Sequence, residues 1–144
     1  KETRMENILL KGRQLVAGKA RGVAIVSRDS LSFWGGVDYK TGTVNEQGHD
    51  IHGQCFAGKI LVCPTGKGSG AGSLRLYDMW LRQVAPIAIL NRTADEVMVI
   101  GAIISDIPMM DSFDLDPVET IHTGDELEID TAAGTVEILK RAQI

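Results

Sequence analysis

A glycine-rich run between an apolar stretch and a helical pattern is the feature that most restricts how this chain can fold. Residues 65–73 read TGKGSGAGS, and every second residue from Gly66 to Gly72 is glycine. The residues before Pro64, Lys59–Cys63, are apolar after the first one. Such a run is typical of a buried strand, and proline ends it because proline has no N–H for the sheet. The sequence therefore predicts a strand that leads directly into a flexible glycine loop.

The residues after the loop predict a helix and a second strand. Over Leu74–Val84 the apolar side chains recur every three or four residues, which places them on one face of a helix. Ser73 is a residue type that caps helix starts, so we expect it to be the N-cap. Pro86 ends the helix, and Pro86–Leu90 is typical of a short strand. The strand, loop, helix and strand form a βαβ unit, whose two strands run parallel.

The remainder of the chain predicts further strands, one more helix and two loops. The expected elements are a strand at Gly22–Val26, loops at Ser32–Asp38 and Asn45–Gly53, a helix at Asp95–Ile104 capped by Thr93 or Asp95, a turn with a short edge strand in Ser105–Asp111, and a hairpin of Glu126–Asp130 and Thr135–Leu139. Because short strands outnumber helices, we expect a β-rich α/β fold with mixed strand pairing. A length of 144 residues fits a single domain over 1–144.

The composition excludes several classes of protein. The chain has 44% hydrophobic and 24% charged residues, which is typical of a globular domain and not of a disordered one. Its formal net charge of -4 argues against nonspecific nucleic-acid binding, and no apolar run approaches the roughly 20 residues of a membrane helix. The first residues show no signal peptide, so we expect a reducing, cytoplasmic compartment. Met5 is a candidate natural start, with residues 1–4 added ahead of it.

The residue types that bind metals do not form a recognisable ligand set. Cys55 and Cys63 make neither a CxxC motif nor a four-ligand site, and two cysteines are too few for an iron–sulfur cluster. Any such cluster would have to be held by a partner chain. His49 and His52 flank Asp50 in a polar loop without an evident third ligand. We therefore expect no metal site in this chain.

Other side chains carry weaker signals. Phe33 and Trp34 lie beside two glycines, and they fit a docking surface and a small core cluster equally well. Asp106 and Asp111 are expected in turns or caps, and His122 in solvent.

The glycine loop is suited to an anion. Glycines let the main chain approach a ligand closely, and the helix start adds free N–H donors and a partial positive charge. A carboxylate, a phosphate or a serine alkoxide would be stabilised there, and Lys67 adds a formal charge. A tight strand-to-helix turn without a ligand remains the alternative.

Three known glycine motifs do not account for the loop. A P-loop would need glycine at position 61, where the chain has Leu61, and the nucleophile elbow G-x-S-x-G does not fit either. Gly66, Gly68 and Ala71 satisfy the dinucleotide fingerprint. However, the following strand ends at Asn91 without an acidic residue, and the chain is too short for a doubly wound sheet.

Four segments in the same order resemble the small subunit of aconitase X, a family of swivelling domains. They are SFWGGVD (Ser32–Asp38), GHDIHGQCFAGKILV (Gly48–Val62), PTGKGSGAGS (Pro64–Ser73) and GAIISDIPMMD (Gly101–Asp111). The similarity extends from about Lys11 to Leu139, so it is much more specific than one glycine loop. The resemblance implies a swivelling β/β/α fold.

The resemblance also implies an activity and a partner. Members of this family dock on a large subunit that carries an iron or iron–sulfur centre, and the two chains form a heterodimeric hydro-lyase. Their substrates are small hydroxy acids, as in phosphomevalonate dehydratase and cis-3-hydroxy-L-proline dehydratase. We therefore expect a dehydratase subunit that is inactive alone. A stand-alone module that binds a phosphate or carboxylate metabolite, and a purely structural subunit, are the alternatives.

Residue roles follow from the same resemblance. Ser69 corresponds to the serine of the family's GxGS loop, which acts as the base that removes a proton beside the substrate carboxylate. Aconitase has an arginine two residues after that serine, whereas this chain has Ala71, so Arg75 or the partner would bind the carboxylate. The expected substrate-binding residues are Gly66, Lys67, Gly68, Gly70, Ser73 and Arg75.

Overall fold

A computed structural model describes residues 7–143, so the candidate start at Met5 lies outside the described part. The strands are β1 (Ile8–Lys11), β2 (Arg13–Val16), β3 (Lys19–Val26), β4 (Val37–Asp38), β5 (Thr43–Val44), β6 (Ile60–Cys63), β7 (Ala88–Asn91), β8 (Met109–Asp111), β9 (Glu126–Asp130) and β10 (Thr135–Lys140). The helices are α1 (Gly72–Leu81), α2 (Glu96–Ser105) and α3 (Pro117–Thr120). In the described part, no helix combines the length and the apolarity that a membrane crossing requires.

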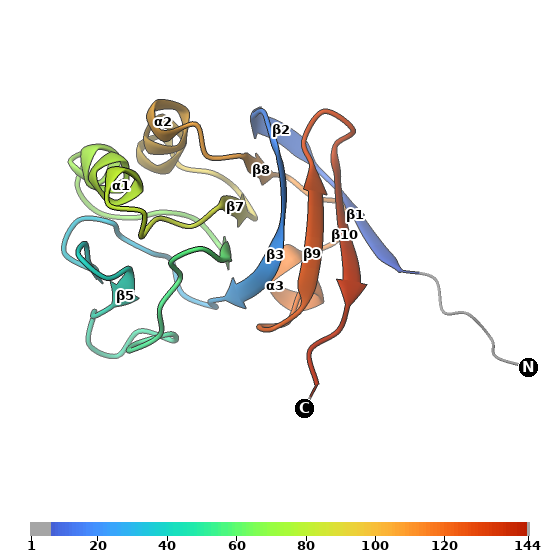
Figure 1. The fold of residues 1–144 in the computed structure, drawn as a ribbon, viewed down its shortest axis with the longest axis horizontal. Helices are drawn as coiled ribbons and strands as arrows, with labels where there is room; N and C mark the ends of the chain where they lie inside the picture. Colours follow the sequence, from blue (N-terminus) through green and yellow to red (C-terminus); the bar gives the residue numbers. More distant parts are fainter. Residues whose placement is uncertain (1–6, 144) are drawn as a thin grey trace, which may run out of the picture.

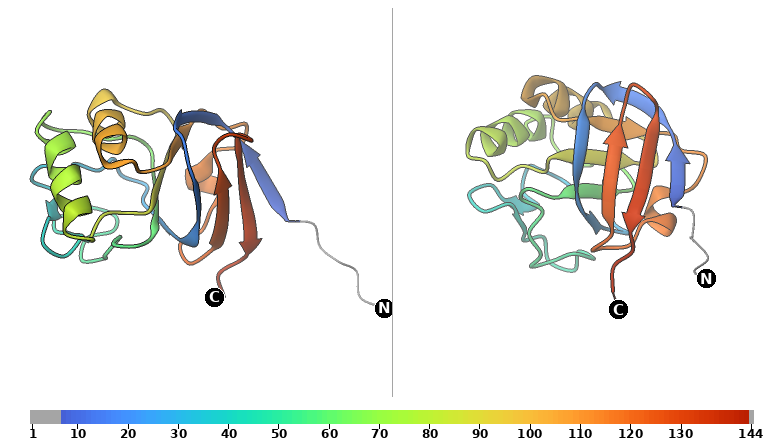
Figure 2. Two further views of the ribbon diagram at one scale, coloured as in Figure 1. Left: turned by 45° about the horizontal axis from the view of Figure 1, so that its top comes forward. Right: turned by 45° about the vertical axis from the view of Figure 1, so that its right-hand side comes forward.

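Eight strands form one mixed sheet that curls into a nearly closed barrel (Figures 1 and 2). Their order is β1-β10-β9-β3-β6-β7-β8-β2, so β1 and β2, which are neighbours in the chain, lie at opposite ends of the sheet. Gly12 connects them. A Cβ atom there would lie 2.5 Å from the Phe113 ring, and the Gly12 N–H donates to the carbonyl of Gly134. A side chain at this corner would therefore prevent closure.

Strands β6 and β7 run parallel and are joined by α1, which confirms the βαβ prediction. Alternate residues of β6 face opposite sides of the sheet. Leu61 and Cys63 pack toward α1 and α2, whereas Ile60 and Val62 pack inside the barrel with residues of β9 and β10. Helices α1 and α2 lie on one side of the molecule, and β9 and β10 lie on the other (Figures 1 and 2).

One sequence expectation about the sheet is wrong, and two strands were not predicted. Strand β8 was expected at an edge because Pro108 lacks a donor, but β8 lies between β7 and β2. Pro108 only precedes the strand, and its carbonyl accepts a hydrogen bond from the Ile89 N–H. Strands β1 and β2 were not expected from any sequence pattern. The helix at Asp95–Ile104 and the C-terminal hairpin are confirmed, and Asp95 caps α2 by accepting from the Met98 N–H.

Candidate functional site

The glycine loop leaves the carboxyl end of β6 and packs on residues 31–34. The Leu31 N–H donates to the Thr65 carbonyl, and the Lys67 N–H donates to the Leu31 carbonyl. Gly68 has a φ of +94°, and a Cβ atom there would lie 2.5 Å from the Ser32 hydroxyl oxygen. Glycine is therefore required at this position for both conformation and space.

The loop also touches the start of α2. A Cβ atom at Gly66 would lie 2.3 Å from the carboxylate of Asp95, the residue that caps α2. At the base of the loop, the buried Asn91 side chain donates to the carbonyl of Cys63 at 3.1 Å. The loop is thus held from two neighbouring segments, and the starts of α1 and α2 lie together beside it.

Ser69 stands exposed where α1 begins. Its hydroxyl oxygen accepts from the Ala71 N–H at 3.1 Å, and its carbonyl accepts from the Gly72 N–H. The N–H groups of Gly68, Ser69 and Gly70 find no acceptor within residues 7–143. The loop therefore presents one hydroxyl and three free donors to solvent at the positive end of a helix, which is an arrangement that stabilises an anion.

Ser73 does not have the capping role expected from the sequence. Ser73 lies inside α1, and the N-cap residue is Ala71, whose side chain makes no capping hydrogen bond. The hydroxyl that bonds near the helix start is that of Ser69, which accepts from the Ala71 N–H. The Ser73 hydroxyl is buried and donates to the Val97 carbonyl at 2.6 Å. It therefore joins α1 to α2 and is turned away from the exposed loop.

Lys67 is paired with a carboxylate. Its ammonium nitrogen lies 2.8 Å from a carboxylate oxygen of Glu46, and both side chains are partly exposed. This pair ties the loop to the segment after β5, and it reduces the positive charge that Lys67 offers to a ligand.

Arg75 is oriented by two aromatic rings. The central carbon of its guanidinium lies 4.4 Å from the centre of the Trp34 ring and 4.3 Å from that of the Tyr39 ring. In residues 7–143, six of the seven arginines pair with a carboxylate, and Arg75 is the exception. Cation–π contact with two rings holds the guanidinium in place, and its N–H donors are not engaged by a carboxylate of the described residues.

The remaining candidates have structural roles. His49 is buried, with one ring nitrogen 2.9 Å from the Ser30 carbonyl and the other accepting from the Ile51 N–H. Phe33 is buried edge-to-face against Phe56, whereas Trp34 is exposed and stacks on Arg75, so these two aromatic residues divide between core and surface. Asp106 ends α2 in the left-handed conformation, as a cap.

Asp111 differs from its predicted turn role. It is buried in β8, where its carboxylate accepts two hydrogen bonds from Arg13 and one from the Ala94 N–H. Burial acts to raise the pKa of this carboxyl group, but the hydrogen bonds from Arg13 and Ala94 outweigh it and lower the pKa below its usual value.

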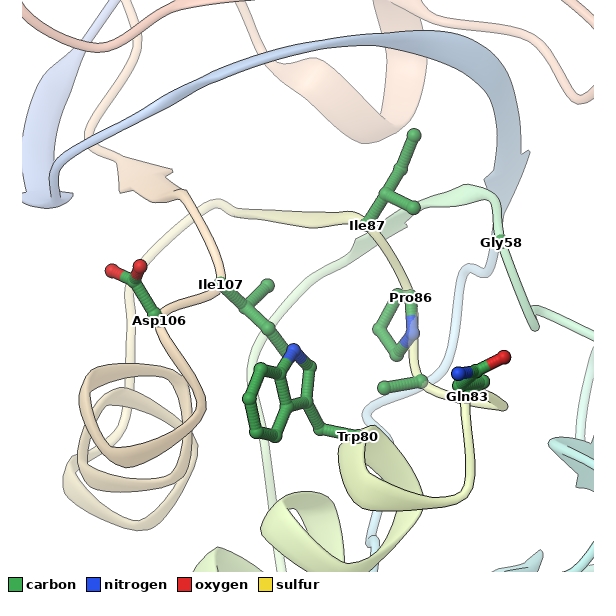
Figure 3. A pocket seen from close by; sticks show the side chains of 8 residues that line it. Gly58, Trp80, Gln83, Pro86, Ile87, Asp106 and Ile107 are labelled. Atoms are coloured by element: carbon green, nitrogen blue, oxygen red, sulfur yellow. The ribbon is translucent and has the colours of Figure 1, made fainter.

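One cavity of the molecule lies away from Ser69. It has a volume of about 340 Å³ and sits between the carboxyl-terminal ends of α1 and α2, where it is lined by Trp80, Pro86, Ile87 and Ile107 (Figure 3). Ser69 lies at the other end of α1, on open surface. The outer side of the loop is thus open to solvent.

The comparisons with known proteins agree on one family. The model of the aconitase X swivel domain matches residues 9–138. The chain belongs to the aconitase X swivel domain family. The α/β swivelling fold expected from the sequence is therefore confirmed, and the chain is a subunit of a hydro-lyase.

Individual relatives cover almost the whole chain. The phosphomevalonate dehydratase small subunit of Methanocella arvoryzae is 46% identical over 129 residues, which cover 90% of this chain and 98% of the relative. That of Thermococcus kodakarensis is 50% identical over 131 residues, which cover 91% of this chain and 96% of the relative. The crystal structure of Thermococcus kodakaraensis aconitase X in its holo-form matches with a TM-score of 0.87 and 50% identity, and the match covers 92% of this chain and 99% of that chain.

The residues of this swivel domain do not fit an iron or iron–sulfur group. Cys63 is fully buried, and burial raises the pKa of its thiol to about 12, so it is not a thiolate ligand. Cys55 is partly buried, and its sulfur lies 3.3 Å from the Thr41 carbonyl. Within the described part of the chain, no three His, Cys, Asp or Glu side chains are grouped so that they could hold a metal ion.

Proposed function

We propose that this swivel domain is the small subunit of a phosphomevalonate dehydratase and that its glycine loop completes an active site on a large subunit. The names of the relatives supply the substrate and the partner. The structural observation that carries the proposal is the exposed Ser69, which stands among unpartnered N–H groups at the start of α1. An iron or iron–sulfur group, where the enzyme uses one, would be held by the large subunit.

In this proposal Ser69 is the base. Dehydration of a 3-hydroxy acid breaks a C–H bond beside the carboxylate and a C–O bond on the next carbon, and a C=C bond forms. The Ser69 alkoxide would take the C–H proton and become the neutral hydroxyl, while a general acid on the large subunit would protonate the substrate hydroxyl so that it leaves as water. Transfer of the Ser69 proton back to that acid would close the cycle. A serine alkoxide needs strong stabilisation, and the Ala71 N–H together with the positive end of α1 would supply part of it.

The two anionic groups of phosphomevalonate match two sets of donors. The N–H groups of Gly68, Ser69 and Gly70 would hold one anion, and Gly66 lets the loop pack closely enough on Asp95 to aim them. The stacked guanidinium of Arg75 would hold the other, in place of the arginine that aconitase has after its serine. Lys67, shared with Glu46, would mainly fix the loop.

A substrate panel on the reconstituted complex tests the proposal. The chain and a large subunit are co-purified, and water elimination is measured with phosphomevalonate, mevalonate and cis-3-hydroxy-L-proline. We expect turnover of phosphomevalonate by the complex and none by the chain alone. Preference for the hydroxyproline would assign the other activity of the family.

Two further measurements address the alternative functions. Tight binding of phosphomevalonate to the isolated chain in calorimetry would indicate a stand-alone binding module. Unchanged turnover after Lys67→Ala and Ser69→Ala together would indicate a structural subunit, because the loop would then take no part in the reaction.

A further inference from the structure

The outer side of the α1–α2 pair carries an unusual amount of exposed apolar surface. We call this surface the two-helix face, and it consists of Leu74, Trp80, Leu81, Ile100, Ile103 and Ile104. Leu74 and Leu81 are seven residues apart on α1, and Ile103 and Ile104 follow Ile100 by three and four residues on α2, so on each helix these side chains share one face. Between Val97 and Ser105, α2 has no charged residue.

The two stripes lie next to each other because the helices approach closely. Gly101 of α2 packs on the backbone of Ser73, where an added Cβ atom would lie 3.2 Å away, and Gly72 packs on Val97. The Ser73–Val97 hydrogen bond holds both helix starts together. Figures 1 and 2 show the pair side by side at the periphery of the molecule, away from β9 and β10. The two-helix face is therefore one surface.

The area of this face approaches that of one side of a standard protein interface. Its side chains are 45 to 66% exposed. At roughly 100 Å² each they expose on the order of 600 Å², which is the upper limit of apolar patches on monomers and most of the about 800 Å² that one partner contributes to a standard interface. Water-exposed apolar surface of this size is unfavourable, so covering it would favour association with a partner.

The position of the face identifies the occupant. Leu74 lies in the first turn of α1, directly after the loop that bears Ser69, and the start of α2 contacts Gly66. A protein seated on the two-helix face would thus border the glycine loop. At the carboxyl-terminal end of α1, Trp80 lines the cavity of Figure 3 together with Ile107. This cavity could receive an apolar side chain of the partner.

We infer that the two-helix face is the surface on which the large dehydratase subunit docks, through a complementary apolar patch beside its catalytic centre. This inference rests on the proposed function, since that function supplies the partner. Docking there would place the Ser69 loop over the partner's active site and remove the face from water in one step.

Charged substitutions on the face test the inference. In Ile103→Lys/Ile104→Lys, each lysine would be desolvated in the interface, so we expect the affinity for the large subunit, measured by calorimetry or biolayer interferometry, to fall at least tenfold. The matched control is Leu9→Lys, which changes a comparably exposed leucine on β1, opposite Glu137. The control should bind within twofold of the unaltered chain. Circular dichroism verifies the fold of each, and Ile103→Ser/Ile104→Ser serves if the lysine variant unfolds.

The other outcomes separate this inference from the proposed function. Unchanged binding of the Ile103→Lys/Ile104→Lys variant to the large subunit would overturn the docking surface while leaving the proposed function intact. A chain that dimerises alone through this face, shown by sedimentation, and that still binds the large subunit elsewhere would assign the face to a second copy and overturn the inference. Failure of the unaltered chain to bind the large subunit would overturn both.

Discussion

Replacing a loop glycine by alanine should destabilise the fold at Gly68 but not at Gly70. At Gly68 the φ of +94° is unfavourable for any residue with a Cβ atom, which costs about 1–2 kcal/mol. The new Cβ would also lie 2.5 Å from the Ser32 oxygen, which donates to the Trp34 carbonyl at 2.6 Å. Displacing that hydroxyl costs about another 1 kcal/mol. Gly68→Ala should therefore lower the free energy of unfolding by about 2–3 kcal/mol.

Gly70→Ala is the matched control. A Cβ atom at Gly70 meets nothing within 4 Å, and its φ is not in the left-handed region. Alanine there should leave the free energy of unfolding within about 0.5 kcal/mol of the unaltered chain. In urea, with an m-value of about 2 kcal/mol/M, Gly68→Ala should lower the unfolding midpoint by roughly 1 M and Gly70→Ala should leave it in place. Equal midpoints for the two variants would refute the packing of the loop on residues 31–34.

Three further predictions concern charge, thiol reactivity and substrate binding. Asp111→Asn should cost about 1–2 kcal/mol, because the bond from Ala94 is buried while solvent screens exposed Arg13. Since the folded pKa of Asp111 lies below its unfolded value, its stabilisation is complete above about pH 4 and is lost as the pH falls through the folded pKa. Between pH 4 and 2, the urea midpoint of Asp111→Asn should thus fall less than that of the unaltered chain. An equal fall of the two midpoints with pH would contradict this. Cys63 should stay unmodified by a disulfide reagent at pH 8 until the chain is unfolded, because burial raises the pKa of its thiol to about 12. Arg75→Ala should raise the KM for phosphomevalonate at least tenfold in the complex with a smaller change in kcat, whereas an unchanged KM would remove Arg75 from the site.

The parts of the fold that local patterns specify could be predicted. Strand β6, the glycine loop, α1 and β7 follow from apolar periodicity and from proline and glycine positions, and all four are short-range signals. Strands β1 and β2 were missed because each has four residues and their pairing is with β10 and β8, more than 90 residues away. The position of β8 between β7 and β2 depends on the same closure of the barrel. A proline before the strand does not show whether the strand lies inside the sheet or at its edge.

In the site, too, local features could be predicted and long-range contacts could not. The identity of the loop residues was evident, whereas the contacts that hold the loop were not. Ser69 and Ser73 are both serines near a helix start, and the sequence does not show that Ser69 bonds to the Ala71 N–H while Ser73 bonds to the Val97 carbonyl. The cation–π contacts of Arg75 with Trp34 and Tyr39 join residues more than 35 positions apart, and no sequence pattern marks them.

Turnover by the complex that carries Ser69→Ala tests the central claim most directly. The hydroxyl is exposed and makes one local hydrogen bond, so its removal should leave the fold and the affinity for the large subunit unchanged. Phosphomevalonate dehydration should nevertheless be lost, with kcat reduced by roughly a thousandfold or more. Near-full turnover by an intact Ser69→Ala complex would contradict the assignment of Ser69 as the base.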